Sequence, residues 1–296
     1  MRMPNLFIIG APKCGTTALS GYLAGHPEVY MSEQAGNKEP EYFADDFRFG
    51  WTAVSGREDY LSLFLNAPRH MRYLGEASVS YLHSKVAVPA ILRCSPEAKF
   101  IVMIRNPVEI AQRLHNQHVK HSLESVLEFE RAWELQRARL DGKYLPVRFQ
   151  DGRGLQYGEL AKIGEQMYRL FSAAPKDQIH VIVYDDFVRA PAAEYEAVNR
   201  FLGIASDGRA SFPVVNPSVS YRVDMVQRAL MWLRGYRERL GLPGGLGIHK
   251  AIDRINAKVG PKPLDPRFRQ KLNEYYRHDI DILSRLLGRD FSVWLQ

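Results

Sequence analysis

The sequence predicts an α/β protein of three layers, in which helices flank a central parallel sheet and a helical extension follows at the C-terminus. Two observations carry this prediction. Short apolar runs alternate with helix-like stretches over the first two hundred residues. The first run, Leu6–Ile9, passes through a glycine-punctuated turn directly into a helix-like stretch, which is the start expected of a fold built from strand–helix units.

The remaining elements follow in order along the chain. Buried strands are expected at 6–9, 72–75, 99–104 and 178–184. Helices are expected at 16–24, 60–66, 84–93, 123–140, 158–171 and 192–202, with another beginning at Pro107, where proline is well tolerated. Ligands of such sheets bind at the carboxyl ends of the strands. We therefore expect Arg105 to lie close to the turn that follows Ile9, although about 90 residues separate the two in sequence.

The composition changes after Gly203. Residues 206–220 are rich in Ser, Pro, Gly and Asn and are expected to form a loop, and an amphipathic helix is expected at 223–240. A final helix starts at Asp265-Pro266. We therefore expect one domain over 1–296, with an α/β core at 5–204, a variable helical or lid segment at 205–264, and a C-terminal helix at 265–296 packed on the core. For the variable segment a helical appendage, a substrate lid, a homodimer contact and a membrane-surface helix all stay open.

The turn after the first strand is a candidate anion site. Gly10 and Gly15 frame a tight loop, and Thr16 opens a helix whose free N–H groups and dipole favour a negative charge. In the usual phosphate loop of P-loop proteins, G-x-x-x-x-G-K-[ST], the lysine follows the second glycine. Here the lysine stands before that glycine, at Lys13. The spacing still suits a phosphate, but the displaced lysine makes a general nucleotide triphosphatase a poor fit.

Pro12-Lys-Cys-Gly-Thr-Thr17 resembles the 5′-phosphosulfate loop of sulfotransferases that use 3′-phosphoadenosine 5′-phosphosulfate (PAPS). The resemblance is closest to a bacterial branch related to the heparan sulfate sulfotransferases. Further segments fit the family in the right order, namely 38–43, 75–78, 101–107 and 158–203. The resemblance implies a P-loop-type fold and transfer of a sulfuryl group from PAPS, leaving adenosine 3′,5′-bisphosphate (PAP), without a metal ion.

The resemblance also implies roles for single residues toward the nucleotide. The loop residues expected to bind the 5′-phosphate are Lys13, Cys14, Gly15, Thr16 and Thr17. Lys13 is expected to be catalytic as well, because it faces the charge that develops on the leaving phosphate. Arg105 corresponds to the arginine that binds the 3′-phosphate, for which a planar bidentate donor is suited. The family tends to place a serine eight residues later, where this chain has Arg113, which we include as a second cation for that phosphate.

On the acceptor side, Glu39 is the expected general base, because the family places a glutamate shortly after the first helix and before an aromatic pair. Glu41 is the second choice, and Lys38 is expected to pair with or orient either. His118 is expected to face the acceptor. Ala77 stands where the heparan-type enzymes carry a lysine, which argues against a direct transfer of their polysaccharide substrate to this chain. The acceptor class therefore stays open among small molecules, glycans and lipids.

Composition sets limits on the other classes. The net charge is +7, but lysine and arginine are scattered, which argues against nucleic acid as a partner. Two cysteines make neither a disulfide framework nor a zinc site. Neither a signal peptide nor an apolar run of about 18 residues is evident, so a cytoplasmic protein without a transmembrane segment is expected. A metal on His115, His118 and His121 is disfavoured because no cysteine or carboxylate completes the set.

Two other functions remain open from the sequence. One is a P-loop kinase or NTPase, for which the run Val181–Asp186 could supply a strand that ends in a metal-binding aspartate. The other is a non-catalytic nucleotide-binding relative. The position of Lys13 and the presence of Arg105 and Glu39 favour sulfuryl transfer over both.

Overall fold

The computed structural model describes residues 2–47, 53–146, 149, 151–213, 215, 219–221, 257–260 and 262–296. The chain divides into two compact units. The first unit comprises Met1–Ile110, Lys162–Asn216 and Asn273–Gln296, and the second comprises Ala111–Ala161 and Pro217–Leu272. The helix expected at 223–240 lies outside the described residues, and a single domain over 1–296 stays a prediction.

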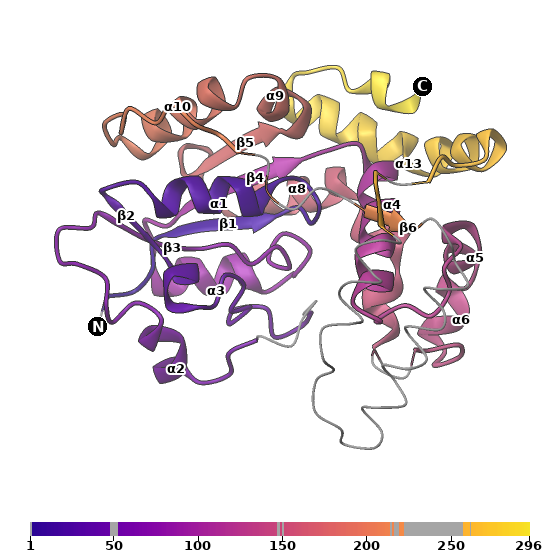
Figure 1. Ribbon diagram of the computed structural model, residues 1–296, viewed down its shortest axis with the longest axis horizontal. Coiled ribbons are helices and arrows are strands. Elements are labelled where there is room, and N and C mark those ends of the chain that lie inside the picture. Colours follow the sequence, from indigo (N-terminus) through magenta and orange to yellow (C-terminus); the bar gives the residue numbers. More distant parts are fainter. Residues whose placement is uncertain are drawn as a thin grey trace. The chain divides into compact units, whose positions relative to one another are not determined.

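A five-stranded sheet forms the centre of the first unit (Figure 1). Its strands are β1 (Leu6–Gly10), β2 (Val29–Met31), β3 (Tyr73–Glu76), β4 (Lys99–Ile104) and β5 (Ile179–Val183). They lie in the order β2-β3-β1-β4-β5, and every neighbouring pair is parallel. The predicted fold class, a parallel sheet flanked by helices with a helical C-terminal region, is confirmed. The short strand β2 was not predicted.

Helices cover both faces of this sheet. Those of the first unit are α1 (Thr16–Ala24), α2 (Arg57–Ser62), α3 (Ala87–Cys94), α8 (Ile163–Ala173), α9 (Tyr184–Arg189) and α10 (Pro191–Leu202), with short 3-10 turns at Ser32–Ala35, Lys176–Gln178 and Ser292–Leu295. The ring of Tyr22 on α1 contacts Phe187 on α9 and Tyr195 on α10, so these helices share a layer. Helices α3 and α8 contact each other, and right-handed crossovers place them on the opposite face.

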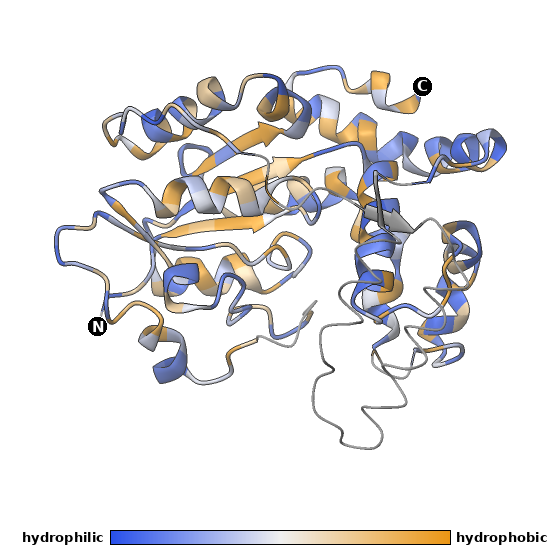
Figure 2. Ribbon diagram, viewed as in Figure 1, coloured by the Kyte–Doolittle hydropathy of each residue, from blue (hydrophilic) through white to orange (hydrophobic). Residues whose placement is uncertain are grey.

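The core of the first unit lies between these layers. Strands β1 and β4 are buried along their whole length except for Lys99. Figure 2 shows the sheet as predominantly hydrophobic, whereas the surrounding helices carry one hydrophobic and one hydrophilic side. This is the pattern that a parallel sheet covered on both faces requires.

Helix α13 (Pro266–Leu287) is the expected C-terminal helix, beginning after Asp265 and ending before Gly288 as predicted. Within the first unit, the Asp279 carboxylate accepts hydrogen bonds from the amides of Gly164 and Glu165, each at 2.8 Å, and so caps the start of α8. A Cβ on Gly164 would lie 2.0 Å from the Asp279 carbonyl oxygen, which explains the glycine. Burial raises the pKa of Asp279 to about 6.

The second unit is largely helical in its described residues. It holds most of α4 (Pro107–Lys120), together with α5 (Phe129–Glu134), α6 (Gln136–Leu140), α7 (Tyr157–Leu160), a 3-10 turn at Gly152–Leu155 and the antiparallel pair β6 (Val219–Tyr221) and β7 (Ala257–Val259). None of the helices in the described parts of either unit has the length and apolar composition needed to cross a membrane.

The single helix predicted at 123–140 is wrong. Residues 123–128 form a loop, in which Ser122 adopts a left-handed backbone and the Glu124 carboxylate accepts a hydrogen bond from the Val126 amide at 2.8 Å. The amides of Leu123 and Glu124 donate to the carbonyl of His118 at 2.8 and 3.3 Å. These local bonds satisfy the backbone without a helix.

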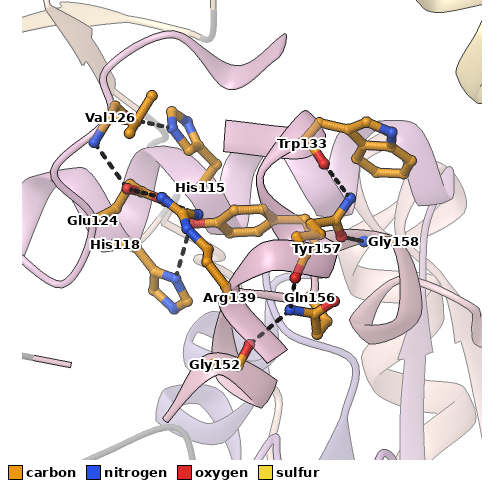
Figure 3. Close-up of polar contacts among 11 residues, drawn as sticks. His115, His118, Glu124, Val126, Trp133, Arg139, Gly152, Gln156, Tyr157 and Gly158 are labelled. Carbon is orange, nitrogen blue, oxygen red and sulfur yellow. Dashed lines mark hydrogen bonds and ion pairs between the residues drawn. The ribbon is translucent and has the colours of Figure 1, made fainter. Parts of the chain in front are cut away.

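A buried ion pair explains why this loop is fixed. Glu124 and Arg139 are joined by two hydrogen bonds, of 2.6 and 2.7 Å, and both side chains are fully buried (Figure 3). The Tyr157 hydroxyl donates to the same carboxylate at 2.8 Å. Burial, followed by the charge of Glu124, raises the pKa of Tyr157 well above its usual range. The phenol therefore stays a donor to Glu124.

Removing one partner of this pair is expected to destabilise the protein strongly. Arg139→Met leaves a buried carboxylate without its cation, which typically costs about 3–5 kcal/mol of unfolding free energy. The double variant Glu124→Leu/Arg139→Met removes both charges and is expected to recover most of that loss. Urea unfolding followed by circular dichroism measures both values.

The exposed pair Arg131–Glu134, at 3.3 Å, supplies the matched control. Its side chains are more than half exposed, so Arg131→Met is expected to cost no more than about 0.5 kcal/mol. Equal losses for Arg139→Met and Arg131→Met would contradict the role assigned to the buried pair.

Candidate nucleotide and acceptor site

The loop between β1 and α1 has the shape expected of an anion site. Gly10 has φ +144° and Gly15 has φ +90°, both in a region that favours glycine. A Cβ on Gly10 would lie 2.9 Å from the Cβ of Leu82. Gly15 is the N-cap of α1, and no side chain caps the helix there. The start of α1 therefore presents its first-turn amides and the positive end of its dipole to this loop.

Lys13 and Arg105 come together at this edge of the sheet. Lys13 has φ +64°, a left-handed conformation uncommon for lysine. Arg105 follows β4 directly, and its guanidinium donates to the Lys13 carbonyl oxygen at 3.5 Å. Because β1 and β4 are parallel neighbours, their carboxyl ends bring these two residues together. The convergence expected from the sequence is present.

The Arg105 guanidinium is held in a defined orientation. It lies 3.9 Å from the ring centroid of Tyr184, the first residue after β5, and the Arg105 residue is buried to 7% exposure. Its Nε donates to the Glu109 carboxylate at 2.8 Å, and a second nitrogen lies 2.5 Å from the same oxygen. A stacked, paired guanidinium loses little freedom when it binds an anion.

The segment with the expected base is attached to the end of β3. Lys38 Nζ contacts the Glu39 carboxylate at 2.6 Å and the Ala77 carbonyl at 3.3 Å, and the Ala77 amide donates to the Lys38 carbonyl at 3.1 Å. About a third of the Glu39 side chain is exposed. Glu41 is 1% exposed and has φ +48°. Of the two candidate bases, Glu39 is therefore the one accessible to an acceptor.

Cys14, Thr16 and Thr17 occupy the loop and the first turn of α1, as expected. Cys14 and Thr16 are buried, and Thr17 is partly exposed. The Cys14 thiol lies 3.5 Å from the Pro12 carbonyl oxygen. This contact places its sulfur against the loop backbone, so a structural role of Cys14 within the loop is sufficient to explain it.

Arg113 and His118 belong to the second unit, where α4 carries both. Arg113 is partly buried. His118 is 2% exposed, and its Nδ1 lies 3.5 Å from the Tyr157 hydroxyl (Figure 3). Its ring contacts Phe149 and Tyr157. His115 is fully buried, its Nε2–H donates a hydrogen bond to the Val126 carbonyl oxygen at 2.8 Å, and burial lowers its pKa. His118 thus borders the buried Glu124–Arg139 cluster.

The two aspartates after β5 have partners other than a metal. Asp186 forms ion pairs with Arg189 and Arg289, which lower the pKa of its carboxyl. Asp185 accepts a hydrogen bond from the Trp294 indole at 3.3 Å. Across the described residues, no group of three or more His, Cys, Asp or Glu side chains is arranged to hold a metal ion.

Two contributors to the site, Tyr184 and Glu109, were missed from the sequence. Tyr184 could have been found, because it follows a predicted strand at the same sheet edge as Arg105. Glu109 lies four residues after Arg105, one turn along α4, which is a recognisable ion-pair spacing. Glu76 lies in the segment 75–78, which was singled out from the sequence, but no role was predicted for it; it is fully buried at the end of β3.

Several known sulfotransferases are similar in sequence to this chain. The two heparan sulfate N-deacetylase/N-sulfotransferases 3, from Mus musculus and Homo sapiens, are 25% and 26% identical over 300 and 302 residues and match all of it. The membrane-associated sulfotransferase kil1 of Dictyostelium discoideum is 33% identical over 109 residues, which cover 36% of this chain and 21% of that protein. The chain spans about a third of the length of the N-sulfotransferase relatives, 31% in both.

A solved structure and a family model give the remaining likenesses. The crystal structure of a sulfotransferase from Alicyclobacillus acidocaldarius is 23% identical, covers all of both chains and superposes with a TM-score of 0.73, which shows a shared fold. The model of the sulfotransferase family matches residues 38–208, more than half of the chain. The match contains Glu39, Glu76 and Arg105. The chain therefore belongs to the sulfotransferase family.

Proposed function

We propose that the protein transfers a sulfuryl group from PAPS to a hydroxyl or amine of an acceptor. This proposal rests mainly on the position of Lys13 and Arg105 next to each other at the carboxyl ends of β1 and β4. The Arg105 guanidinium stacks on Tyr184 and donates to the Lys13 carbonyl oxygen. One cation serves the 5′-phosphate at the start of α1, and the other serves the 3′-phosphate. The membership of the chain in the sulfotransferase family supports this reading.

For this reaction the protein mainly has to position the two substrates in line and to stabilise the charge that develops. The bond between sulfur and the 5′-phosphate oxygen breaks as sulfur bonds to the acceptor oxygen or nitrogen. Negative charge develops on the leaving phosphate, where Lys13 and the first-turn amides of α1 stabilise it. The acceptor proton passes to Glu39, and PAP leaves. Cys14, Gly15, Thr16 and Thr17 complete the proposed phosphate loop, with Arg113 as a further cation on α4.

For the acceptor we propose only a chemical class, an amine or a hydroxyl group. The relatives that match the whole chain are named as heparan sulfate N-sulfotransferases, so a glycan amine is one candidate. Ala77 in place of the family lysine removes a cation from the end of β3, which favours a less anionic acceptor than that polysaccharide. Glu39 serves as the base for either an amine or a hydroxyl, and His118 is proposed as an acceptor contact.

Nucleotide binding separates this function from a kinase or NTPase. We expect PAP to bind tightly in the presence of EDTA, because the proposed site uses lysine, arginine and amides in place of Mg²⁺. ATP is expected to bind weakly, since it lacks a 3′-phosphate for Arg105. Isothermal titration calorimetry with PAP and ATP, with and without Mg²⁺, measures this. Tight ATP binding that requires Mg²⁺ would overturn the proposal.

Lys13→Ala tests stabilisation of the leaving group. Loss of one preorganised donor to developing charge typically lowers kcat by about 10²–10³-fold, and we expect a loss of this size in the release of PAP from PAPS. Lys176→Ala is the matched control, because Lys176 precedes β5 and so lies at the amino ends of the strands, away from Lys13. Unchanged turnover in Lys13→Ala, with circular dichroism like the wild type, would show that the mechanism is wrong.

Arg105→Lys tests recognition of the 3′-phosphate. The substitution keeps a positive charge but loses the forked donor and the stacking on Tyr184. We expect the Kd of PAP to rise about 10- to 100-fold while that of AMP changes less than about threefold. Tyr184→Phe keeps the ring and is expected to behave like the wild type. A similar loss for PAP and AMP would mean that Arg105 does not distinguish the 3′-phosphate.

A further inference from the structure

Glu76, at the end of β3, is a fully buried carboxyl held only by hydroxyl groups among its described contacts. Tyr60 and Tyr81 donate to Oε1 at 2.6 and 2.9 Å, and Ser78 donates to Oε2 at 2.5 Å. The Glu76 residue has 0% exposure, and no described lysine or arginine is paired with it. Such burial without a cation is costly, so this arrangement needs an explanation beyond packing.

Two of the three hydroxyls also bind the segment 38–43, which carries Glu39. Ser78 Oγ accepts from the Glu41 amide at 3.0 Å, and Tyr81 Oη accepts from the Phe43 amide at 3.3 Å. Each hydroxyl therefore receives a hydrogen bond from the segment and passes its own hydrogen to Glu76. The third hydroxyl, that of Tyr60, has a described hydrogen bond to Glu76 but none to an amide of the segment. The Tyr60 ring instead stacks on the ring of Tyr42, with centroids 4.3 Å apart.

The direction of these bonds is fixed by the number of hydrogens. A hydroxyl has one hydrogen, and an amide can only donate. If Ser78 and Tyr81 accept from the segment, their hydrogens must go to an acceptor, and Glu76 is that acceptor. An ionised carboxylate accepts all three hydroxyls at once, whereas a protonated carboxyl or an amide in its place adds a donor and forces one hydroxyl to turn.

The segment 38–43 depends on such support. Glu41 holds a left-handed backbone at φ +48°, which costs free energy and persists only where neighbours fix it. We propose that Glu76 is a positioning residue for sulfuryl transfer: through Ser78 and Tyr81 it fixes the segment 38–43, and so the place of the Glu39 carboxylate. This inference rests on the proposed function of Glu39 as the base.

The protonation of Glu76 gives this device a pH signature. Burial, together with the smaller effect of the Glu41 charge, raises the pKa of Glu76 to about 7 despite its three hydroxyl donors. The other titratable groups around it are Tyr60 and Tyr81, whose pKa values burial raises well above the usual range, so both stay protonated. The ion pair Lys38–Glu39 borders the neighbouring Ala77. As the pH falls below about 7, Glu76 gains a proton and the hydroxyl bonds to it must rearrange.

Hydrogen exchange of the Glu41 and Phe43 amides tests the inference directly. In Glu76→Gln we expect exchange of these amides to quicken about tenfold at pH 8, as for the loss of one hydrogen bond each. After correction for the intrinsic rate, protection of these amides in the wild type should change as the pH passes through about 7 and stay flat in the variant. Exchange in Glu76→Gln that equals the wild type at every pH would overturn the proposal.

Conservative variants keep the test valid if Glu76→Gln folds poorly. Tyr81→Phe removes the acceptor of the Phe43 amide, and Ser78→Ala removes that of the Glu41 amide, so each is expected to quicken exchange at its own amide. Tyr60→Phe is the matched control: it removes one donor to Glu76 but no bond to a segment amide, and it keeps the stack on Tyr42. A larger effect of Tyr60→Phe than of Tyr81→Phe on the Phe43 amide would contradict the inference.

The second measurement is turnover, followed as the release of PAP from PAPS with de-N-sulfated heparin or water as the acceptor. In Tyr81→Phe and Glu76→Gln we expect kcat for PAP release from PAPS to fall about tenfold or more, while the Kd of PAP stays within about twofold because the donor contacts are untouched. Weak PAP binding by the wild type would refute the proposed function. Intact PAP binding with wild-type kcat in both variants would refute the role of Glu76 alone.

Discussion

The parallel pairing of β1 with β3 on one side and β4 on the other is the constraint on which the rest of the site depends. It places the loop after β1, Glu76 and Arg105 at the carboxyl ends of three adjacent strands, although the chain separates them widely. A parallel sheet needs a crossover between each pair of strands, and those crossovers are the helices that bury its faces. The same hydrogen-bond register therefore builds the core and assembles the candidate site.

Sequence reasoning succeeded where the signal is local. The bounds of α1 and β4 were predicted to the residue, because a glycine turn and an unbroken apolar run need no tertiary information. It failed at β2, whose three residues become a strand only by pairing with β3. It also failed at 123–140, where helical spacing was overridden by Glu124, whose partner Arg139 lies fifteen residues away.

The candidate site shows the same division. Lys13, Arg105 and Glu39 were named from motifs, and the structure adds how they are held, by Tyr184, Glu109 and the end of β3. The hydroxyls of Tyr60 and Tyr81 reach Glu76 from different elements, and no spacing in the sequence connects them. Two of the buried carboxyls are thus held by different means: Glu124 is bonded to a guanidinium, whereas the described partners of Glu76 are neutral hydroxyls, and burial raises the pKa of Glu76 to about 7.

Trp294 is a fluorescent side chain that lies close to Arg105. Its carbonyl accepts a hydrogen bond from the Asn106 side chain at 2.9 Å, and its indole N–H bonds Asp185. Asn106 adjoins Arg105, and Asp185 adjoins Tyr184, so a largely buried indole is linked through one residue to each member of the stacked pair. Indole emission responds to local field and hydrogen bonding. The contribution of Trp294 to the intrinsic fluorescence is therefore expected to respond to the binding of an anion at Arg105, without any attached dye.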